Sequence, residues 1–398
     1  MKKVLLITEM FPPMLGGAAN YYYKLCANLP AANVVVLADN SYEATRNLTF
    51  KSFKFKVYYK SFFFKNKYIW PKWLRLIYEA NKIIKLEKPR ILWVGEILPG
   101  GLVVLLISKI YGLPYFVSTH GSDVLNPLYK PGIKGRWKRL LVRKVLAGAS
   151  FVTANAEYTR LILSKMGIPR DRSVTIYPCA TLKPPVPENT TSRHIEVIKE
   201  LKAAGFKILL TAVGHMVRRK GIDKVIESLP LVWSEKPKIA YVITGDGAYK
   251  DRLEKMAKAK DSFVDNRSRI IFTGPISESE LKKVYELTDI YIMIPRIIQG
   301  LTEGFGIVYL EANHFGKPAI GSKITGIPEA INALSDDNHD KATGLLVDNP
   351  TNRREIAKKI LMLVKDEGLA KKLGANGKIW AEKFNWATEA KKLENKLN

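Results

Sequence analysis

Two glutamates eight positions apart, Glu303 and Glu311, are the residues whose type and spacing most clearly indicate chemistry. A Gly-Phe-Gly turn follows the first, and an apolar, helix-like run precedes the second. Eight positions of helix span roughly 12 Å and bring both side chains to a similar face. That is about the distance from the sugar ring to the ribose in a nucleotide-sugar, and a glycine-bracketed helix start exposes N–H groups that suit a diphosphate. The pair could be an acid–base couple, two clamps on one ligand, or a chance spacing.

Other candidate residues follow predicted strands. Gly16 and Gly17 come between the first strand and the first helix, where a phosphate can meet a helix N-terminus. His120 follows another buried strand and could donate to a sugar hydroxyl or a phosphate, although a lone histidine is more often structural. The three cations at 218–220 precede a helix and predict a site that binds a phosphate. The alternative interpretation of these residues is a basic loop exposed to solvent. Turns at 245–247 and 273–276 would let a flat base lie against the backbone.

No metal-binding pattern is evident in the sequence. His120, His215 and His314 are scattered, and no Asp-x-Asp that could hold a divalent ion follows a strand. Charge on a leaving group would then be stabilised by Lys220, neighbouring arginines and helix N-termini. We therefore expect neither a metal nor another cofactor.

Alternating strands and helices must position these residues. The strands expected in the first half are 4–8, 33–37, 91–94, 115–119, 151–154 and 174–176, with helices at 18–29, 73–86 and 137–147. The strands expected in the second half are 207–213, 240–244, 269–273, 290–294, 318–321 and 344–347. This alternation predicts an α/β protein with two doubly wound, Rossmann-like domains facing across a cleft.

The domain boundaries follow from the same pattern. We expect an N-terminal, acceptor-binding domain at 1–183 and a C-terminal, nucleotide-sugar-binding domain at 207–385. A Pro-rich segment begins the linker expected at 184–206. A last helix, 386–398, could pack back on the first domain.

Composition excludes several classes of protein. The two cysteines form no CxxC pair, so neither a disulfide framework nor a structural zinc site is expected, and a reducing compartment fits best. The first apolar run ends at Thr8, too early for a secretory signal, and the longest uncharged apolar stretch, 97–107, is far below the ~20 residues that span a bilayer. We expect a cytoplasmic protein that lies peripherally at the inner face of the cell membrane.

The net charge of +27 is concentrated in the first half, where residues 1–190 hold 29 Lys and Arg against 10 Asp and Glu. Within 46–90, 13 basic residues alternate with many aromatic ones. A second basic run supplies the residues expected at a membrane or acceptor: Lys134, Lys138, Arg139 and Arg143. Cations beside aromatic rings favour an anionic membrane surface. The alternatives are a solvated basic face and nucleic acid, for which no recognition motif is present.

Together these segments resemble the retaining glycosyltransferases of family 4, which have the two-domain GT-B fold. The resemblance extends over essentially the whole chain and rests on these motifs: Phe11-Pro12-Pro13, Gly16-Gly17, His120-Gly121, Lys220-Gly221, Gly245-Asp246-Gly247, Glu303 through Glu311, Thr325-Gly326-Ile327-Pro328-Glu329 and Gly344-Leu345-Leu346-Val347. The Glu-x7-Glu motif with Gly-Phe-Gly is highly specific. The opening segment and the run from Ile294 to Ala312 look most like the mannosyltransferases that extend phosphatidylinositol mannosides.

The resemblance implies roles for the site residues. Glu311 would bind the ribose, Glu303 the transferred sugar, Lys220 the diphosphate and Ile276 the base. The donor-binding residues implied are Gly16, Gly17, His215, Arg219, Lys220, Gly245, Ile276, Phe305, Gly306, Ile307 and Glu311. His120 would touch the sugar or promote departure of the phosphate. Anomeric configuration would be retained by front-face attack, with the leaving phosphate accepting the acceptor's proton.

One position departs from the family pattern. Directly after the glycine of the phosphate loop, where the family usually has arginine, this chain has His215. Histidine is largely neutral at pH 7 and lacks the guanidinium fork, so Arg218 or Arg219 would have to compensate.

The sequence thus favours a retaining, metal-independent glycosyltransferase. It would move a hexose, with mannose from GDP-mannose favoured, to a lipid-linked or glycolipid acceptor. Two alternatives stay open: a UDP-sugar-dependent glycosyltransferase of polysaccharide or glycolipid assembly, and a degenerate protein that binds membranes or polyanions.

Overall fold

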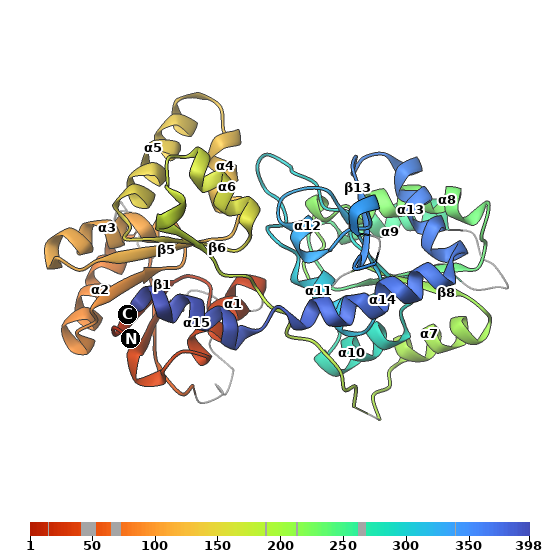
Figure 1. Ribbon diagram of the computed structural model, residues 1–398, viewed down its shortest axis with the longest axis horizontal. Helices are drawn as coiled ribbons and strands as arrows, with labels where there is room; N and C mark the ends of the chain where they lie inside the picture. Colours follow the sequence, from red (N-terminus) through yellow and green to blue (C-terminus); the bar gives the residue numbers. More distant parts are fainter. Residues whose placement is uncertain are drawn as a thin grey trace. The chain divides into compact units, whose positions relative to one another are not determined.

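The computed structural model describes residues 1–14, 16–40, 53–64, 73–187, 189–211, 214–261, 268–338 and 340–398. The chain divides into two compact units (Figure 1), one made of Met1–Cys179 and Asn385–Asn398 and the other of Ala180–Phe384. Each unit holds one parallel sheet, and the predicted fold class of two doubly wound α/β domains is confirmed.

The first unit is built on a seven-stranded parallel sheet in the order β3-β2-β1-β4-β5-β6-β7. Its strands are β1 (Val4–Thr8), β2 (Val34–Asp39), β3 (Lys56–Lys60), β4 (Ile91–Val94), β5 (Tyr115–Thr119), β6 (Val152–Ala154) and β7 (Ser173–Thr175). Strand β1 pairs with β2 on one side and with β4 on the other. The strand order therefore reverses beside the carboxyl ends of β1 and β4, where ligands bind in such folds.

Helices cover both faces of this sheet. They are α1 (Gly17–Ala27), α2 (Leu74–Glu87), α3 (Gly100–Tyr111), α4 (Ser122–Tyr129), α5 (Gly132–Gly148), α6 (Glu157–Lys165) and α15 (Trp386–Leu397). Leu5 and Ile7 of β1 belong to a core shared with α2, α3 and α5, whereas Val4 and Leu6 belong to a core shared with α1 and α15. This alternation follows from the two-residue period of a strand.

Helix α15 is the last element of the chain and lies beside α1 (Figure 1). The Lys2 N–H donates to the carbonyl of Leu397 at 3.2 Å, so the two ends of the chain meet in this unit. The Trp386 ring packs edge-on against Tyr21 of α1 with centroids 5.9 Å apart.

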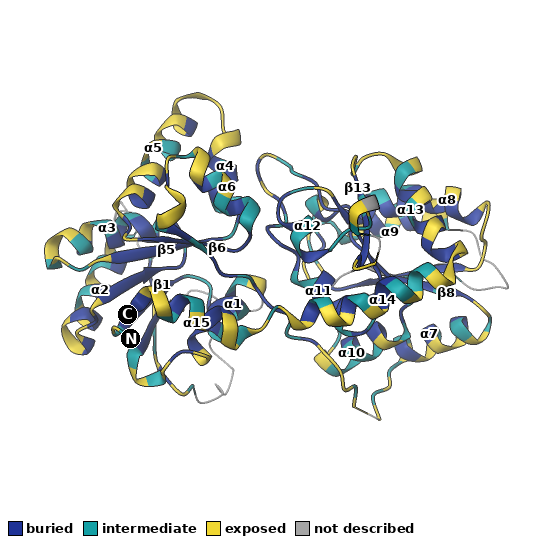
Figure 2. Ribbon diagram, in the orientation of Figure 1, coloured by how far each residue is buried: buried dark blue, intermediate teal, exposed yellow. Residues whose placement is uncertain are grey.

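The second unit is built on a six-stranded parallel sheet in the order β10-β9-β8-β11-β12-β13. Its strands are β8 (Lys207–Thr211), β9 (Ile239–Thr244), β10 (Ile270–Gly274), β11 (Ile290–Ile292), β12 (Ala319–Ser322) and β13 (Gly344–Val347). Its helices are α7 (Arg193–Ala203), α8 (Ile222–Trp233), α9 (Lys250–Lys260), α10 (Glu278–Leu287), α11 (Ile307–His314), α12 (Ile327–Ala330), α13 (Arg353–Lys365) and α14 (Glu367–Glu382). Strands are buried along most of their length and helices expose their outer faces (Figure 2).

Two segments differ from the sequence-based expectation. The linker expected over 184–206 contains α7, which begins at the N-cap Ser192 and packs against β8 and α10 of the second unit. The edge strand β3 was not expected, because its residues are exposed or half-buried and carry no apolar alternation. Parts of the basic, aromatic segment 46–90 and the end of the strand expected at 207–213 lie outside the described residues.

Candidate active site

The Glu-x7-Glu segment in the second unit is a loop followed by a helix. Helix α11 begins at Ile307, directly after Gly306, whose φ of 88° suits glycine. A Cβ at Gly306 would lie 2.5 Å from the Tyr309 ring, which leaves no room for another residue. Only Glu311 is therefore helical, and the expectation that one helix presents both glutamates is wrong.

The carboxylate of Glu303 faces the predicted phosphate loop. Arg219 Nη1 donates to Glu303 Oε2 at 2.8 Å, and both side chains remain partly exposed, 31% for Arg219 and 24% for Glu303. The backbone carbonyl of Glu303 accepts from Thr325 Oγ1 at 2.6 Å, and the Gly326 N–H donates to the Gly304 carbonyl at 3.0 Å. The turn after β12 thus holds the loop that carries Glu303.

Lys220 lies buried at the end of the short 3₁₀ turn Arg218–Lys220. Burial lowers the pKa of Lys220, while the negative charge of Glu303 acts in the opposite direction. A Cβ built on Gly214 would lie 3.4 Å from Lys220 Nζ, so the ammonium group lies against the glycine of the phosphate loop. The structure therefore brings Arg219, Lys220 and Glu303 into one cluster.

A buried ion pair holds the phosphate loop in place. Arg296 Nη2 donates to both carboxylate oxygens of Asp223 at 2.8 Å and to the Arg218 carbonyl at 2.7 Å. The Arg296 N–H also donates to the Arg219 carbonyl at 2.7 Å. The sequence assigned no role to either partner, because nothing in the local pattern links two residues 73 positions apart.

The glycine turns after β8 and β9 pack backbone against backbone. The Met216 N–H donates to the Asp246 carbonyl at 2.7 Å. A Cβ on Gly245 would lie 2.4 Å from the Gly214 carbonyl oxygen, and one on Gly247 would lie 2.5 Å from Met216 N. Both glycines are therefore required for this approach, which leaves the strand ends without side chains at these points.

The remaining predicted donor residues lie on neighbouring parts of this edge. Ile276 is half-buried after β10, just before the capping box that starts α10 at Ser277. Phe305 is buried against Phe384, with ring centroids 5.5 Å apart. His215 is exposed, as is Arg218.

Glu311 is buried, and its carboxylate accepts from two side-chain hydroxyl groups and from the backbone N–H groups of Thr181 and Leu182. Its carboxylate accepts from Thr181 Oγ1 at 3.2 Å and from Tyr285 Oη at 3.3 Å. Burial raises the pKa of Glu311 above the usual range of a glutamate. The charge of Glu311 also acts on Lys220, so both glutamates belong to the same electrostatic environment.

In the first unit, the exposed residues Gly16 and Gly17 begin α1, and His120 follows β5 beside the same helix. His120 Nε2 lies 2.7 Å from Tyr22 Oη, and the rings of Tyr21 and Tyr22 meet the imidazole edge-on. Burial lowers the pKa of His120 to about 4, so the ring is neutral at physiological pH. Sequence reasoning missed Tyr22, because no local pattern links it to a histidine 98 positions away.

Two carboxyl groups that the sequence did not single out lie at the carboxyl ends of β1 and β4. Glu96 accepts from Thr8 Oγ1 at 2.6 Å and from the Glu9 N–H at 2.9 Å. Burial raises the pKa of Glu96 to about 8, and burial together with the charge of Asp39 raises that of Glu9 to about 7. The rule that functional residues follow buried strands would have found Glu96, which comes two positions after β4.

Comparison with known proteins decides the family. Residues 15–183 match the model of Glycosyltransferase Family 4, and residues 195–380 match that of Glycosyl transferases group 1. The chain belongs to glycosyltransferase family 4.

Two curated relatives match this family 4 glycosyltransferase over its full length. The GDP-mannose-dependent monoacylated alpha-(1-6)-phosphatidylinositol monomannoside mannosyltransferase of Corynebacterium glutamicum is 24% identical, with 100% of this chain and 98% of the relative covered. A GDP-mannose-dependent alpha-(1-6)-phosphatidylinositol monomannoside mannosyltransferase of Mycobacterium tuberculosis is 27% identical, with 100% and 98% covered.

Solved structures of other proteins share the fold. Anabaena HepE in complex with UDP has a TM-score of 0.76 at 17% identity, with 100% of this chain and 99% of that chain covered. WaaG, a glycosyltransferase involved in lipopolysaccharide biosynthesis, has a TM-score of 0.66 at 16% identity, with 98% of each chain covered. The predicted GT-B fold is confirmed. As a family 4 member, this protein is a retaining glycosyltransferase that uses a nucleotide-sugar.

The basic residues predicted for the membrane or acceptor lie on α5 of the glycosyltransferase and differ in their surroundings. Lys134 and Arg143 are exposed. Lys138 Nζ donates to Asn126 Oδ1 at 3.2 Å, and Arg139 Nη1 donates to the carbonyls of Pro127 and Lys130 at 3.1 and 2.8 Å. Lys138 and Arg139 therefore brace α4 against α5, whereas the side chains of Lys134 and Arg143 are exposed to solvent.

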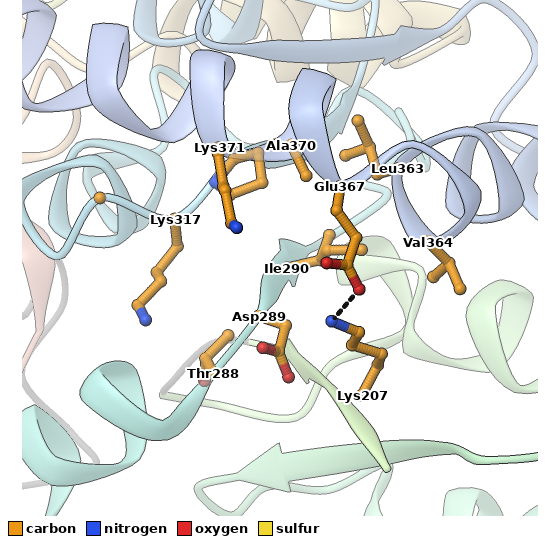
Figure 3. Close-up of a pocket in the computed structure, with 12 residues that line it drawn as sticks. Lys207, Thr288, Asp289, Ile290, Lys317, Leu363, Val364, Glu367, Ala370 and Lys371 are labelled. Carbon is orange, nitrogen blue, oxygen red and sulfur yellow. Dashed lines mark ion pairs between the residues drawn. The ribbon is translucent and has the colours of Figure 1, made fainter. Parts of the chain in front are cut away.

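A cavity of about 190 Å³ lies at the opposite edge of the second sheet from the candidate site. Its lining includes Lys207 and Ile290, which begin β8 and β11, whereas the candidate site follows strand ends. Figure 3 shows its charged side chains, among them Lys207 and Glu367, which form an ion pair of 2.8 Å. Asp289 is paired with Lys202 at 2.9 Å. The cavity is therefore separate from the cluster of Arg219, Lys220 and Glu303 and from the surroundings of His120.

Two negative findings apply to the parts of the chain that the structure describes. Within the ranges given above, no three His, Cys, Asp or Glu side chains come together as metal ligands would. None of the helices placed in these ranges has the length and apolarity needed to cross a bilayer.

Proposed function

We propose that this glycosyltransferase transfers a hexose, with mannose from GDP-mannose favoured, to a lipid-linked or glycolipid acceptor. The observation that carries the proposal is the cluster of Arg219, Lys220, Glu303 and Glu311 at the carboxyl edge of the second sheet. It offers two cations for a diphosphate and two carboxylates for hydroxyl groups. The two curated relatives, which name GDP-mannose as donor and phosphatidylinositol mannosides as acceptors, support the choice of sugar and acceptor.

In this proposal the second unit binds the donor. This unit, Ala180–Phe384, contains almost all of the domain that the sequence predicted at 207–385 to bind the nucleotide-sugar. Lys220 and Arg219 hold the diphosphate together with the N–H groups of Phe305, Gly306 and Ile307. Arg219 takes the place of the arginine that His215 replaces, because its guanidinium is partly exposed and lies 2.8 Å from the Glu303 carboxylate. When the donor binds, Arg219 turns from Glu303 to the diphosphate, and Glu303 becomes free for a hydroxyl of the sugar.

The nucleoside end of the donor follows from the same geometry. Glu311 accepts hydrogen bonds from the ribose hydroxyls, as its contacts with two neutral hydroxyl donors suggest. The base lies against the turns of Gly245 and Ile276, which follow β9 and β10. We also propose that the N–H groups of Gly16 and Gly17, at the start of α1 in the N-terminal domain expected at 1–183, bind a phosphate.

The reaction exchanges one bond at the anomeric carbon. The bond from that carbon to the diphosphate oxygen breaks, and a bond from the acceptor oxygen forms on the same face. The acceptor's proton passes to the departing phosphate, so the products are a glycoside and a nucleoside diphosphate. Lys220 and Arg219 stabilise the charge that develops on the phosphate, and no metal is assigned a role.

Two other functions remain as outcomes of the tests. A UDP-sugar donor is favoured by the similar fold of HepE, which has been solved with UDP and with UDP-glucose. A degenerate protein that only binds membranes or polyanions is favoured by His215 in place of arginine.

Calorimetry with GDP-mannose, UDP-glucose and UDP-N-acetylglucosamine separates these functions. We expect heat with GDP-mannose and little with the UDP-sugars. Stronger binding of a UDP-sugar would replace the donor assignment. The absence of heat with all three would favour the degenerate protein that only binds membranes or polyanions.

Variants of the cluster test the residue roles. Lys220→Ala and Glu303→Gln should each lower donor turnover at least about a hundredfold, since charge-assisted contacts in an active site contribute about 3 kcal/mol. Lys224→Ala is a matched control, because this lysine lies four positions further on, in the first turn of α8, and pairs with Glu227 at 2.6 Å. Turnover near that of the wild type in both cluster variants would contradict the assignment.

We also propose that α5 docks on an anionic leaflet at the cytoplasmic face of the membrane. Ile133, Trp137 and Leu140 are 73%, 63% and 50% exposed, and a helix of 3.6 residues per turn places them within about 60° of one another. Exposed cations lie beside this stripe, namely Lys134, Arg136 and Arg143, and the exposed Lys144 continues it one helical turn beyond Leu140. Apolar side chains that enter a leaflet beside cations facing its headgroups are typical of a peripheral membrane helix.

Vesicle sedimentation tests this surface. Binding should require anionic lipid and weaken with salt. Replacing Ile133 and Trp137 by serine should reduce partitioning at least about tenfold, because each buried apolar side chain contributes about 1.5–3 kcal/mol. Ile379→Ser is the matched control, since this side chain is 66% exposed on α14 of the other unit. Equal binding to neutral vesicles would overturn the proposal.

A further inference from the structure

The contact between Tyr22 of α1 and His120 fixes where the proton of the imidazole lies. Tyr22 Oη is 2.7 Å from His120 Nε2 and also donates to the Gly95 carbonyl, which follows β4. Both contacts lie within the first unit and join parts of the chain 73 and 98 positions apart.

Counting protons decides the direction of each bond. A phenol has one hydrogen, and a carbonyl oxygen can only accept, so the Tyr22 hydrogen points to Gly95. The second contact of Tyr22 Oη must then receive a hydrogen from His120 Nε2. The reverse arrangement would leave Tyr22 Oη and the Gly95 oxygen facing each other with no hydrogen between them. Burial raises the pKa of Tyr22 well above its ordinary value, so the phenol keeps its hydrogen.

A neutral imidazole with hydrogen on Nε2 has a lone pair on Nδ1. Burial keeps the His120 ring neutral, with a pKa of about 4. The carboxylate of Asp123, on the same turn, accepts from the backbone N–H groups of His120 and Val124 at 3.0 Å, and no bond between it and the imidazole is among the contacts of the described residues. Among the residues that the structure describes, Nδ1 has no hydrogen-bond partner, and the side chain is only partly buried.

We propose that Tyr22 is a positioning residue that holds His120 as the Nε2–H tautomer, so that Nδ1 accepts a hydrogen bond from a substrate hydroxyl. This inference rests on the proposed function for its substrate. It reverses one expectation for His120, which cannot donate from Nδ1 to the departing phosphate. The hydroxyl belongs to the transferred sugar or to the acceptor. Because Tyr22 keeps the hydrogen on Nε2, His120 presents only the lone pair of Nδ1 to the ligand, which favours a ligand group that donates.

Nuclear magnetic resonance of the protein labelled at histidine tests the tautomer without any turnover. The wild-type spectrum should show the Nε2–H form at His120, assigned by its loss in His120→Asn. Tyr22→Phe should give a mixture of tautomers. Tyr21→Phe is the matched control, because the Tyr21 ring also packs against His120 but its hydroxyl does not contact the imidazole. The Tyr21 hydroxyl donates instead to the Ile176 carbonyl at 3.3 Å. An Nδ1–H form in the wild type, or equal spectra for the two tyrosine variants, would overturn the proposal.

Kinetics then identify the source of the hydroxyl. In Tyr22→Phe, kcat for transfer should fall about tenfold, while binding of the free nucleoside diphosphate stays unchanged. The variant's rate of slow donor hydrolysis, measured without acceptor, should also fall about tenfold if the hydroxyl belongs to the transferred sugar. That rate should be unchanged if the hydroxyl belongs to the acceptor. Loss of nucleoside diphosphate binding in this variant would contradict the inference.

A second pair of variants covers the case in which Tyr22→Phe does not fold. The amide of asparagine reaches the position of Nδ1 and that of glutamine the position of Nε2. His120→Asn should therefore keep more transfer activity than His120→Gln, and the opposite order would overturn the assignment of Nδ1. If no variant or wild type turns over any donor, the proposed function fails while the tautomer result still stands.

Discussion

The ion pair between Arg296 and Asp223 offers the sharpest test of how the donor site is held. Asp223→Asn keeps the shape of the side chain and removes its charge. Arg296 and Asp223 are 8% and 4% exposed, so the guanidinium stays buried without its counter-charge. Breaking a buried pair in this way costs about 3–5 kcal/mol. The remaining hydrogen bond to the Arg218 carbonyl favours the lower end of that range.

Urea denaturation followed by circular dichroism measures the loss. With a slope of about 3 kcal/mol per molar urea, a loss of about 3 kcal/mol lowers the midpoint by about 1 M. Only the transition of the second unit should move, since both residues lie within it. Donor binding should weaken as well, because Arg296 also holds the loop that carries Arg219 and Lys220.

A double variant separates stability from positioning. Replacing Asp223 by leucine and Arg296 by methionine removes both charges, which is often neutral or stabilising for a buried pair. The midpoint should recover, but donor affinity should not, because the bond to the Arg218 carbonyl is lost. An unchanged midpoint in Asp223→Asn, or donor affinity of the wild type in the double variant, would refute this reasoning.

Three further predictions follow from single contacts. Gly221→Ala should destabilise the second unit by at least about 1–2 kcal/mol in a thermal melt, because φ is +72° and the new Cβ would lie 1.8 Å from the Ile294 carbonyl oxygen. Glu311→Gln should weaken donor binding about tenfold or more in calorimetry without loss of stability, since it removes a charged acceptor but keeps the contact with Thr181. Burial would raise the pKa of Glu87, but hydrogen bonds from two lysines and a tyrosine outweigh it and hold the pKa at about 2. The stability that Glu87 contributes should therefore be complete above pH ~4.5 and disappear between that pH and about 2, and acid titration of the Glu87→Gln variant should lack this component.

The alternation of strands and helices could be predicted because it is a local property. Strands buried on both faces are continuous apolar runs, so β1, β4, β5 and β13 have the bounds expected. Strand β3 has no such run, because an edge strand buries less of its surface and its residues are exposed or half-buried. Helix α7 was taken as linker, because the prolines before it are a stronger local signal than its short apolar face.

The sequence by itself determined which turns carry the candidate site. In a parallel sheet, turns after strands meet at one edge whatever the details of packing, so Lys220, Gly245 and Glu303 could be selected before any coordinates. Only the tertiary structure decided which side chains are partners. Arg219 meets Glu303, and Tyr22 meets His120, across 84 and 98 positions of chain. Such contacts depend on the rotation and burial of whole elements, which local sequence patterns do not encode.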